Sequence, residues 1–178
     1  MPVFIGCLLP VTIGIYTDFK TNKLYDAITI PILLSGLVYA SSNGALKESL
    51  VGAAALFLVY FALAWFIGGV GGGDIKLAAG IGAWFGLSGG IYVIIIASFL
   101  AIVGGIVKLA FMGRAKQKLK YWLNGIWLYL LYKKMTIKPP QLPQEGEEMP
   151  AEMIPFGMYM GVAVWVWFLY TCQPWLLI

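Results

Sequence analysis

Two aspartates, Asp18 and Asp74, are the residues of this chain whose type and position could do chemistry. Asp18 ends the first apolar segment, and Asp74 stands between a glycine-rich run and a later apolar segment. An ionisable residue at the edge of a membrane helix costs free energy and therefore marks a candidate functional site. Two carboxylates within a few ångströms share one proton and offer one base and one acid, the chemistry of an aspartic protease.

Each acid also has a simpler interpretation. Taken alone, Asp74 is equally well explained as the N-cap of the helix that follows it, because a carboxylate satisfies free backbone N–H groups there. Asp18 could simply end the first span at the membrane interface. A third acid, Asp26, lies just ahead of the second apolar segment and is predicted to be its N-cap. Glycines directly before Asp74 allow other groups to approach its carboxylate closely: Gly68, Gly69, Gly71, Gly72 and Gly73.

The composition is that of a membrane protein. Of the 178 residues, 61% are hydrophobic, and the mean hydropathy is +0.86, whereas soluble domains are about 45–50% apolar. We predict an all-α, polytopic membrane protein whose single domain covers residues 1–178, with no soluble domain attached. No basic residue precedes the first apolar run, so we expect a permanent first span and not a cleavable signal peptide.

The sequence excludes several kinds of catalysis. It contains no histidine, so Ser-His and Cys-His nucleophiles and histidine metal sites are ruled out. The two cysteines, Cys7 and Cys172, are too few for a structural zinc site. We predict two buried free thiols, with a disulfide as the alternative. No metal, no cofactor and no nucleic-acid partner is expected.

Six apolar segments predict six membrane-spanning helices. They lie at about 2–17, 27–42, 49–69, 74–87, 89–112 and 154–176. The fourth segment would be only ~21 Å long as a helix, less than the ~30 Å hydrocarbon thickness. It either spans a thinned bilayer or begins below the headgroups, which would place Asp74 in a sheltered aqueous pocket. Glycines inside the spans, Gly86 and the pair Gly157 and Gly161 among them, are predicted to allow close helix packing.

Basic residues predict the orientation. With the N-terminus outside, eleven of the twelve lysines and arginines lie on the inner side, and only Lys47 lies outside. This bias predicts that both termini are outside and that Asp18 and Asp74 share the cytoplasmic side. The loop 113–153 is predicted to hold an interfacial helix at about 119–135 and a flexible tether at 138–153. A seventh, thinned span is the alternative for the helix. The basic residues of this loop are either an orientation signal or a grip on substrate.

A family resemblance rests on three segments. Gly71-Gly72-Gly73-Asp74-Ile75-Lys76-Leu77 resembles the G-x-G-D signature of the type IV prepilin peptidases, which are polytopic aspartyl proteases of prokaryotic membranes. Asp18 and the polar residues after it resemble the family's other aspartate, and Ile154-Pro155-Phe156-Gly157 resembles the element that opens its last span. The resemblance implies that Asp18 and Asp74 are catalytic. It also implies that substrate binding or structural support comes from Gly71, Gly73, Lys76, Pro155, Phe156 and Gly157.

The resemblance also implies a function. The family removes the basic leader from a prepilin or pseudopilin at the cytoplasmic face of the prokaryotic cytoplasmic (inner) membrane, so the expected partners are such a substrate and the lipid bilayer. Tyr25 and Asp26 stand where the family commonly has proline and asparagine, which makes Asp26 a decoy. Larger members carry a four-cysteine, zinc-binding insert that is associated with N-methylation. This chain lacks it, so methyltransferase activity is not expected.

Other interpretations remain open at this point. Archaeal preflagellin peptidases share the acid pair and are the alternative within the family. A small transporter or channel could use Asp18 and Asp74 to bind a cation. A non-catalytic component of a pilus machine is a third alternative, although a scaffold has no need of two costly acids. The sequence does not predict the oligomeric state.

Overall fold

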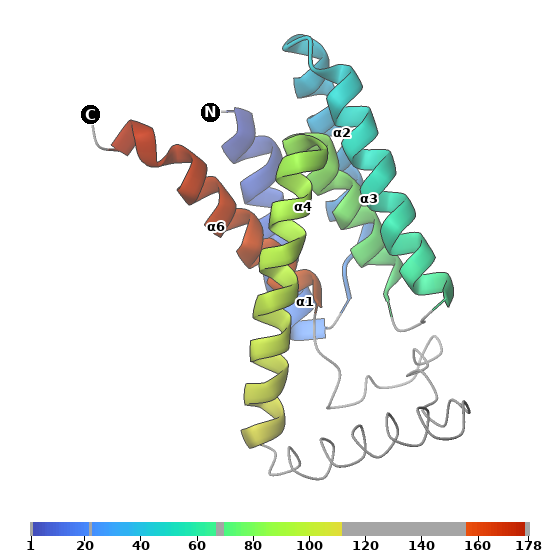
Figure 1. Cartoon of the computed structure of the whole chain (residues 1–178), viewed down its shortest axis with the longest axis vertical. Helices are drawn as coiled ribbons and strands as arrows, with labels where there is room; N and C mark the ends of the chain where they lie inside the picture. The colour runs from blue at the N-terminus through green and yellow to red at the C-terminus, as the bar shows by residue number, and fades with distance from the viewer. Residues whose placement is uncertain (1, 22, 67–69, 112–155, 177–178) are drawn as a thin grey trace, which may run out of the picture.

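The structure, a computed structural model, describes residues 2–21, 23–66, 70–111 and 156–176. Within these ranges it is helical and has no β-strand, in agreement with the predicted all-α class. Figure 1 shows the elements in chain order: the π-helical turn η1 (Phe4–Leu8), α1 (Leu9–Thr21), α2 (Asp26–Ser42), α3 (Leu46–Phe66), α4 (Gly72–Phe111) and α6 (Phe156–Leu176). The predicted interfacial helix at 119–135, the tether at 138–153 and Pro155 lie outside the described residues.

Within the described residues, helices lie in all six predicted spans. Two of them are long and apolar enough to cross a membrane by length and composition: Leu46–Phe66, with a mean hydropathy of 2.1, and Gly72–Lys108, with 2.6. The outer faces carry large exposed apolar side chains such as Trp65 and Phe66. Apolar patches of this kind mark membrane or protein interfaces. Six crossings of the bilayer remain a prediction.

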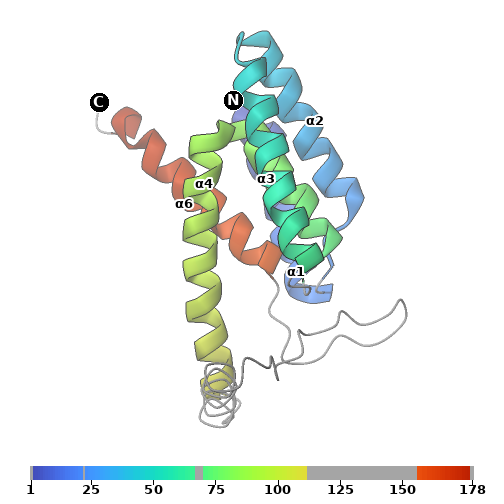
Figure 2. The ribbon, with the colours of Figure 1, turned by 45° about the vertical axis from the view of Figure 1, so that its right-hand side comes forward.

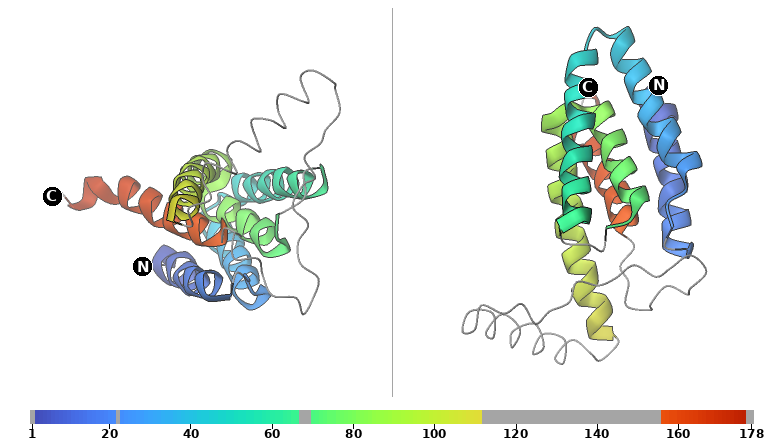
Figure 3. Two further views of the ribbon diagram at one scale, coloured as in Figure 1. Left: turned by 90° about the horizontal axis from the view of Figure 1, so that it is seen from below. Right: turned by 90° about the vertical axis from the view of Figure 1, so that its right-hand side faces the viewer.

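The helix α4 is broken at Gly86. Its φ of 67° and ψ of −172° are not helical, and a positive φ favours glycine because a Cβ would be strained there. The predicted boundary near residue 88 is thus found at Gly86, which turns the chain. Its backbone also packs against α3, because a Cβ on Gly52 would lie 2.6 Å from the Gly86 carbonyl carbon. The first leg of α4 rises beside α3, and the second leg returns antiparallel to it (Figure 2). Seen from below, the first leg is central among the helices (Figure 3, left).

The contact of α3 with α4 is made by bare backbone. A Cβ on Gly82 would lie 2.5 Å from the carbonyl carbon of Gly52, and one on Gly52 would lie 2.6 Å from the carbonyl oxygen of Gly82. The buried Ser49 hydroxyl donates a hydrogen bond of 2.6 Å to the Ala83 carbonyl, just before the break in α4. Small residues thus bring the two helix backbones together, as predicted for the glycines of the spans.

A proline explains the irregular start of the first helix. Pro10 has no N–H to donate to the Gly6 carbonyl one turn earlier, and π-helical turns are frequent where the regular ladder is interrupted. The Ser35 hydroxyl of α2 donates to that carbonyl at 3.0 Å. A buried carbonyl needs such a donor, so the interruption also fixes η1 against α2.

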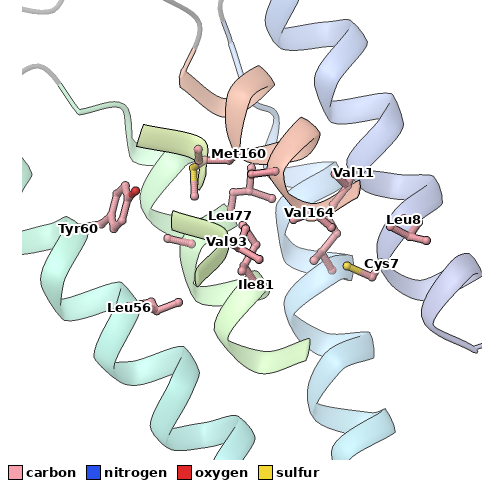
Figure 4. Close-up of a cluster of buried hydrophobic side chains, with 14 residues drawn as sticks. Cys7, Leu8, Val11, Leu56, Tyr60, Leu77, Ile81, Val93, Met160 and Val164 are labelled. Atoms are coloured by element: carbon pink, nitrogen blue, oxygen red, sulfur yellow. The ribbon is translucent and has the colours of Figure 1, made fainter. Parts of the chain in front are cut away.

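The core lies between η1, α1, α2, α3, both legs of α4 and α6 (Figure 4). It is built from Leu, Ile, Val, Ala and Met side chains that are almost fully buried. Leu77 and Ile81 come from the first leg of α4, Val93 from the second, and Met160 and Val164 from α6. This core fixes the start of α4 beside the start of α6, and these two helix starts and the end of α1 carry the candidate site.

Candidate active site

Asp18 lies in the last turn of α1 and is 4% exposed. Its carboxylate accepts a hydrogen bond of 2.7 Å from the backbone N–H of Met158, in the first turn of α6. The first N–H groups of a helix have no partner within that helix, and the helix N-terminus attracts negative charge. Asp18 therefore caps α6 from another helix. Burial raises the pKa of the Asp18 carboxyl above its usual value, and the Met158 N–H partly opposes this shift. Asp18 is not an exposed residue that merely ends a span.

Asp74 is the third residue of α4 and is half-buried. Its own N–H donates to the Gly71 carbonyl at 3.1 Å. Its carboxylate turns back toward Gly71, where an added Cβ would lie 3.4 Å from Asp74 Oδ2 and the backbone N–H donates to the acid. A residue at the third helical position commonly reaches back in this way. Asp74 thus supports the start of its helix from inside the first turn, and the alternative that it is the N-cap is wrong.

The two acids lie at the same end of the molecule. They are close enough for their charges to interact, although one belongs to α1 and the other to α4. Beside them lies Leu24 of the connection to α2, which contacts Gly73 of α4 and Gly157 of α6. Three helices, α1, α4 and α6, therefore meet around the pair.

Tyr60 of α3 is a further member of the site that the sequence analysis missed. It is 4% exposed and interacts electrostatically with Asp74. Its ring lies 6.2 Å from that of Phe156, centroid to centroid. Nothing in the sequence singles out one tyrosine inside an apolar helix, because only the fold brings it to the acid.

The remaining predicted glycines differ in their surroundings. A Cβ on Gly73 would lie 2.6 Å from Leu24 Cβ and 2.8 Å from the Leu24 carbonyl oxygen, so only glycine allows this approach. Gly157 faces both Leu24 and Asp18. Gly72 has nothing within 4 Å of its Cβ position. Among the described glycines of the run, Gly73 is approached closely by Leu24, and the Cβ position of Gly71 lies 3.4 Å from Asp74 Oδ2. Gly68 and Gly69 lie outside the described residues.

Asp26 lies apart from the pair. It is the first residue of α2, and the N-cap is Tyr25, whose side chain makes no capping bond. The prediction that Asp26 is the N-cap is therefore wrong. Both carboxylate oxygens of Asp26 lie 2.6 Å from Lys76 Nζ, in a pair whose side chains are 43% and 57% exposed for Lys76 and Asp26. Lys76 is two positions after Asp74 and points to another side of the helix, where it ties the start of α4 to the start of α2.

The cysteines are unpaired, so the disulfide alternative is wrong. Cys7 is buried, as predicted, but Cys172 is only half-buried. Within the described part of the chain, no group of three or more His, Cys, Asp or Glu side chains could hold a metal ion.

A bundle of apolar helices with two neighbouring acids at one end defines a class: an all-α protein with an acid-pair site. The sequence model of the type IV leader peptidase family matches residues 4–106, a range that includes both acids. The chain belongs to this family.

Curated relatives agree with the match. The chain is 30% identical over 174 residues to a prepilin leader peptidase/N-methyltransferase of Xanthomonas campestris. The aligned region covers 93% of this chain and 48% of the relative. Proteins of the same name from Aeromonas hydrophila (31% over 159 residues; 85% and 43%) and Escherichia coli K12 (33% over 121 residues; 64% and 52%) are also similar. The chain spans about half the length of the curated relatives it matches. No solved structure gives a significant match.

Proposed function

We propose that this protein is an aspartyl endopeptidase that removes the basic leader from a prepilin or pseudopilin at the cytoplasmic face of the membrane. The single observation that carries the proposal is the placement of Asp18 and Asp74, from different helices, within electrostatic range of one another at one end of the bundle. Membership of the type IV leader peptidase family and the names of the curated relatives support the same reaction.

In the proposed mechanism the two acids hold one proton between them and titrate as a pair. Asp18, whose carboxylate accepts the Met158 N–H, takes a proton from water as the water oxygen adds to the scissile carbonyl. Asp74 donates its proton to that carbonyl oxygen. The resulting diol collapses as one of its hydroxyls returns a proton to Asp74, the C–N bond breaks, and the amine leaves with the proton returned from Asp18. Proton transfers of this kind typically contribute factors of about 10² to 10⁴ to the rate.

The proposed topology has six spans, both termini outside and the acids on the cytoplasmic side of a prokaryotic membrane. The lysine and arginine asymmetry supports the orientation, and the long apolar helices α3 and α4 support the membrane location. Single cysteines placed at exposed Lys20 and Lys47 in a Cys7→Ser/Cys172→Ser background test it. An impermeant thiol reagent added to intact cells should label the cysteine at position 47 and not the one at position 20, and the reverse pattern would overturn the orientation.

Coexpression with a candidate prepilin tests the reaction. Wild type should convert the precursor to the shorter form on a gel, and Asp18→Asn and Asp74→Asn should abolish conversion while accumulating normally in the membrane. Asp26→Asn is the matched control and should retain substantial cleavage. Cleavage by purified protein in detergent, with no ion gradient, would separate a peptidase from a cation transporter. Full activity of Asp74→Asn would end the proposal.

A further inference from the structure

The connection between α1 and α2 places one apolar side chain, Leu24, beside the acid pair. Leu24 belongs to the non-helical residues 23–25 and is half-buried. Three glycines from three helices face it: Gly14 of α1, Gly73 of α4 and Gly157 of α6. A Cβ on Gly14 would lie 3.4 Å from Leu24 Cδ2, and one on Gly157 would collide with Leu24 Cδ1. Leu24 thus fills a space with bare-backbone walls, which we call the glycine cradle (Gly14, Gly73 and Gly157).

The glycine cradle adjoins the Asp18 carboxylate. The Cβ position of Gly157 is 3.0 Å from Leu24 Cγ and 3.0 Å from Asp18 Oδ2. Whatever fills the cradle is therefore a direct neighbour of this acid. Asp18 is 4% exposed, so a peptide bond can reach it only after a covering group has moved. Leu24 can move without unwinding a helix, because it lies in a connection and meets Gly14 and Gly157 only through side-chain atoms.

The walls of the cradle select for apolar groups. Apart from Asp18, the atoms nearest to the three glycine positions belong to Leu24 and to Ile28, whose Cγ2 is 3.6 Å from the Cβ position of Gly14. No basic side chain is among them. An arginine or lysine would lose its hydration there with a single carboxylate as partner, whereas an aliphatic side chain would only replace the leucine already present.

We propose that the glycine cradle is a substrate subsite, which Leu24 fills in the free protein and which the first apolar side chain after the scissile bond fills when a peptide binds. The inference rests on the proposed function and adds to it a recognised group: an aliphatic or aromatic side chain of about leucine size. When the peptide binds, the substrate side chain enters the cradle and Leu24 leaves it. The apolar area that Leu24 then exposes is offset by the apolar area that the substrate side chain buries. A smaller substrate residue gains less from the exchange.

The test measures the cleavage kinetics of each enzyme variant on each of three substrates. Three synthetic prepilin segments that span the leader and the first turns of the apolar helix differ only in the residue after the cut: Ala, Leu or Phe. Gly14→Val narrows the cradle at its α1 wall, where a Cβ would lie 3.4 Å from Leu24 Cδ2. It should lower kcat/KM about tenfold for the Leu and Phe segments and by less than about twofold for the Ala segment, a discrimination typical of apolar pockets. Gly72→Ala, at a glycine with open space around it, should match wild type on all three.

A second variant keeps the test decisive if Gly14→Val does not fold. Leu24→Ala removes the group to be displaced, so KM for the Leu segment should fall severalfold with kcat unchanged. Equal losses on all three segments, or an unchanged or higher KM in Leu24→Ala, would overturn the subsite and leave the peptidase intact. If the wild type cut none of the segments and no coexpressed prepilin, the proposed function would fail, and the subsite with it.

Discussion

Two sets of glycines in this molecule make close contacts of different kinds. At the contact of α3 with α4, Gly52 and Gly82 face each other's backbone. At the acid end, Gly14 and Gly157 face the side chain of Leu24. In both places a Cβ would meet its neighbour, but backbone atoms of two packed helices cannot yield, whereas a side chain on a connection can. The first set is suited to a permanent contact, and the second to one that opens.

This difference bears on how a buried acid pair becomes accessible to a peptide. Interiors packed at high density do not deform gradually, so motion concentrates where few contacts hold a group. The acid end combines fixed parts, the starts of α4 and α6, with one replaceable part, Leu24. Glycine frequency alone does not separate these roles, because the atoms opposite each glycine decide them.

Breaking the permanent contact should have the largest effect on the fold. Gly82→Ala places a methyl group against the Gly52 backbone, which must shift. We expect a destabilisation of about 1–3 kcal/mol, the usual cost of overpacking. Thermal unfolding in detergent micelles measures it. Gly72→Ala is the control and should unfold like wild type, and equal stability of the two variants would contradict the distinction.

Removing one hydrogen bond at the acid end should affect activity more than stability. Met158→Pro removes the N–H that donates a hydrogen bond to the Asp18 carboxylate. The helix should persist, because proline is tolerated in the first turn of a helix. A hydrogen bond to a charged group contributes about 1.5–3 kcal/mol, so kcat should fall by a factor of about ten to one hundred with little change in KM. Met158→Ala keeps the N–H and should keep the activity. Loss of activity in both variants would instead point to the methionine side chain.

The exposed ion pair of Asp26 and Lys76 should matter least. Exposed pairs contribute about 0.2–1 kcal/mol, so Asp26→Asn and Lys76→Met should each shift the unfolding temperature slightly. Cleavage should stay within about threefold of wild type. A double-mutant cycle on unfolding would give the coupling of the two side chains. Complete loss of cleavage in Asp26→Asn would mean that the wrong acid was chosen.

The features that the sequence predicted are those that depend on the lengths and positions of its apolar runs. Segment positions, the all-α class and the break near residue 88 follow from hydrophobic length, and the position of both acids at helix ends follows from where those runs stop. The family resemblance was carried by local patterns around Asp74 and Gly157, which need no knowledge of the fold.

What the sequence did not predict depends on contacts across the chain. Asp26 looked like an N-cap because it precedes an apolar run, but Lys76, 50 residues later, takes its carboxylate. Tyr60 and Leu24 are ordinary residues for an apolar helix and a short connection, and only packing brings them to the acids. The turn at Gly86 was not predicted, since a positive φ leaves no mark in a glycine-rich sequence.

The bond between Asp18 and Met158 joins residues 140 positions apart. During synthesis both acids are made long before α6, whose Met158 N–H donates to Asp18. A nascent chain that has not yet made α6 therefore carries both carboxylates without this donor. We expect the position of the Asp18 side chain to be fixed only when α6 has packed against α1.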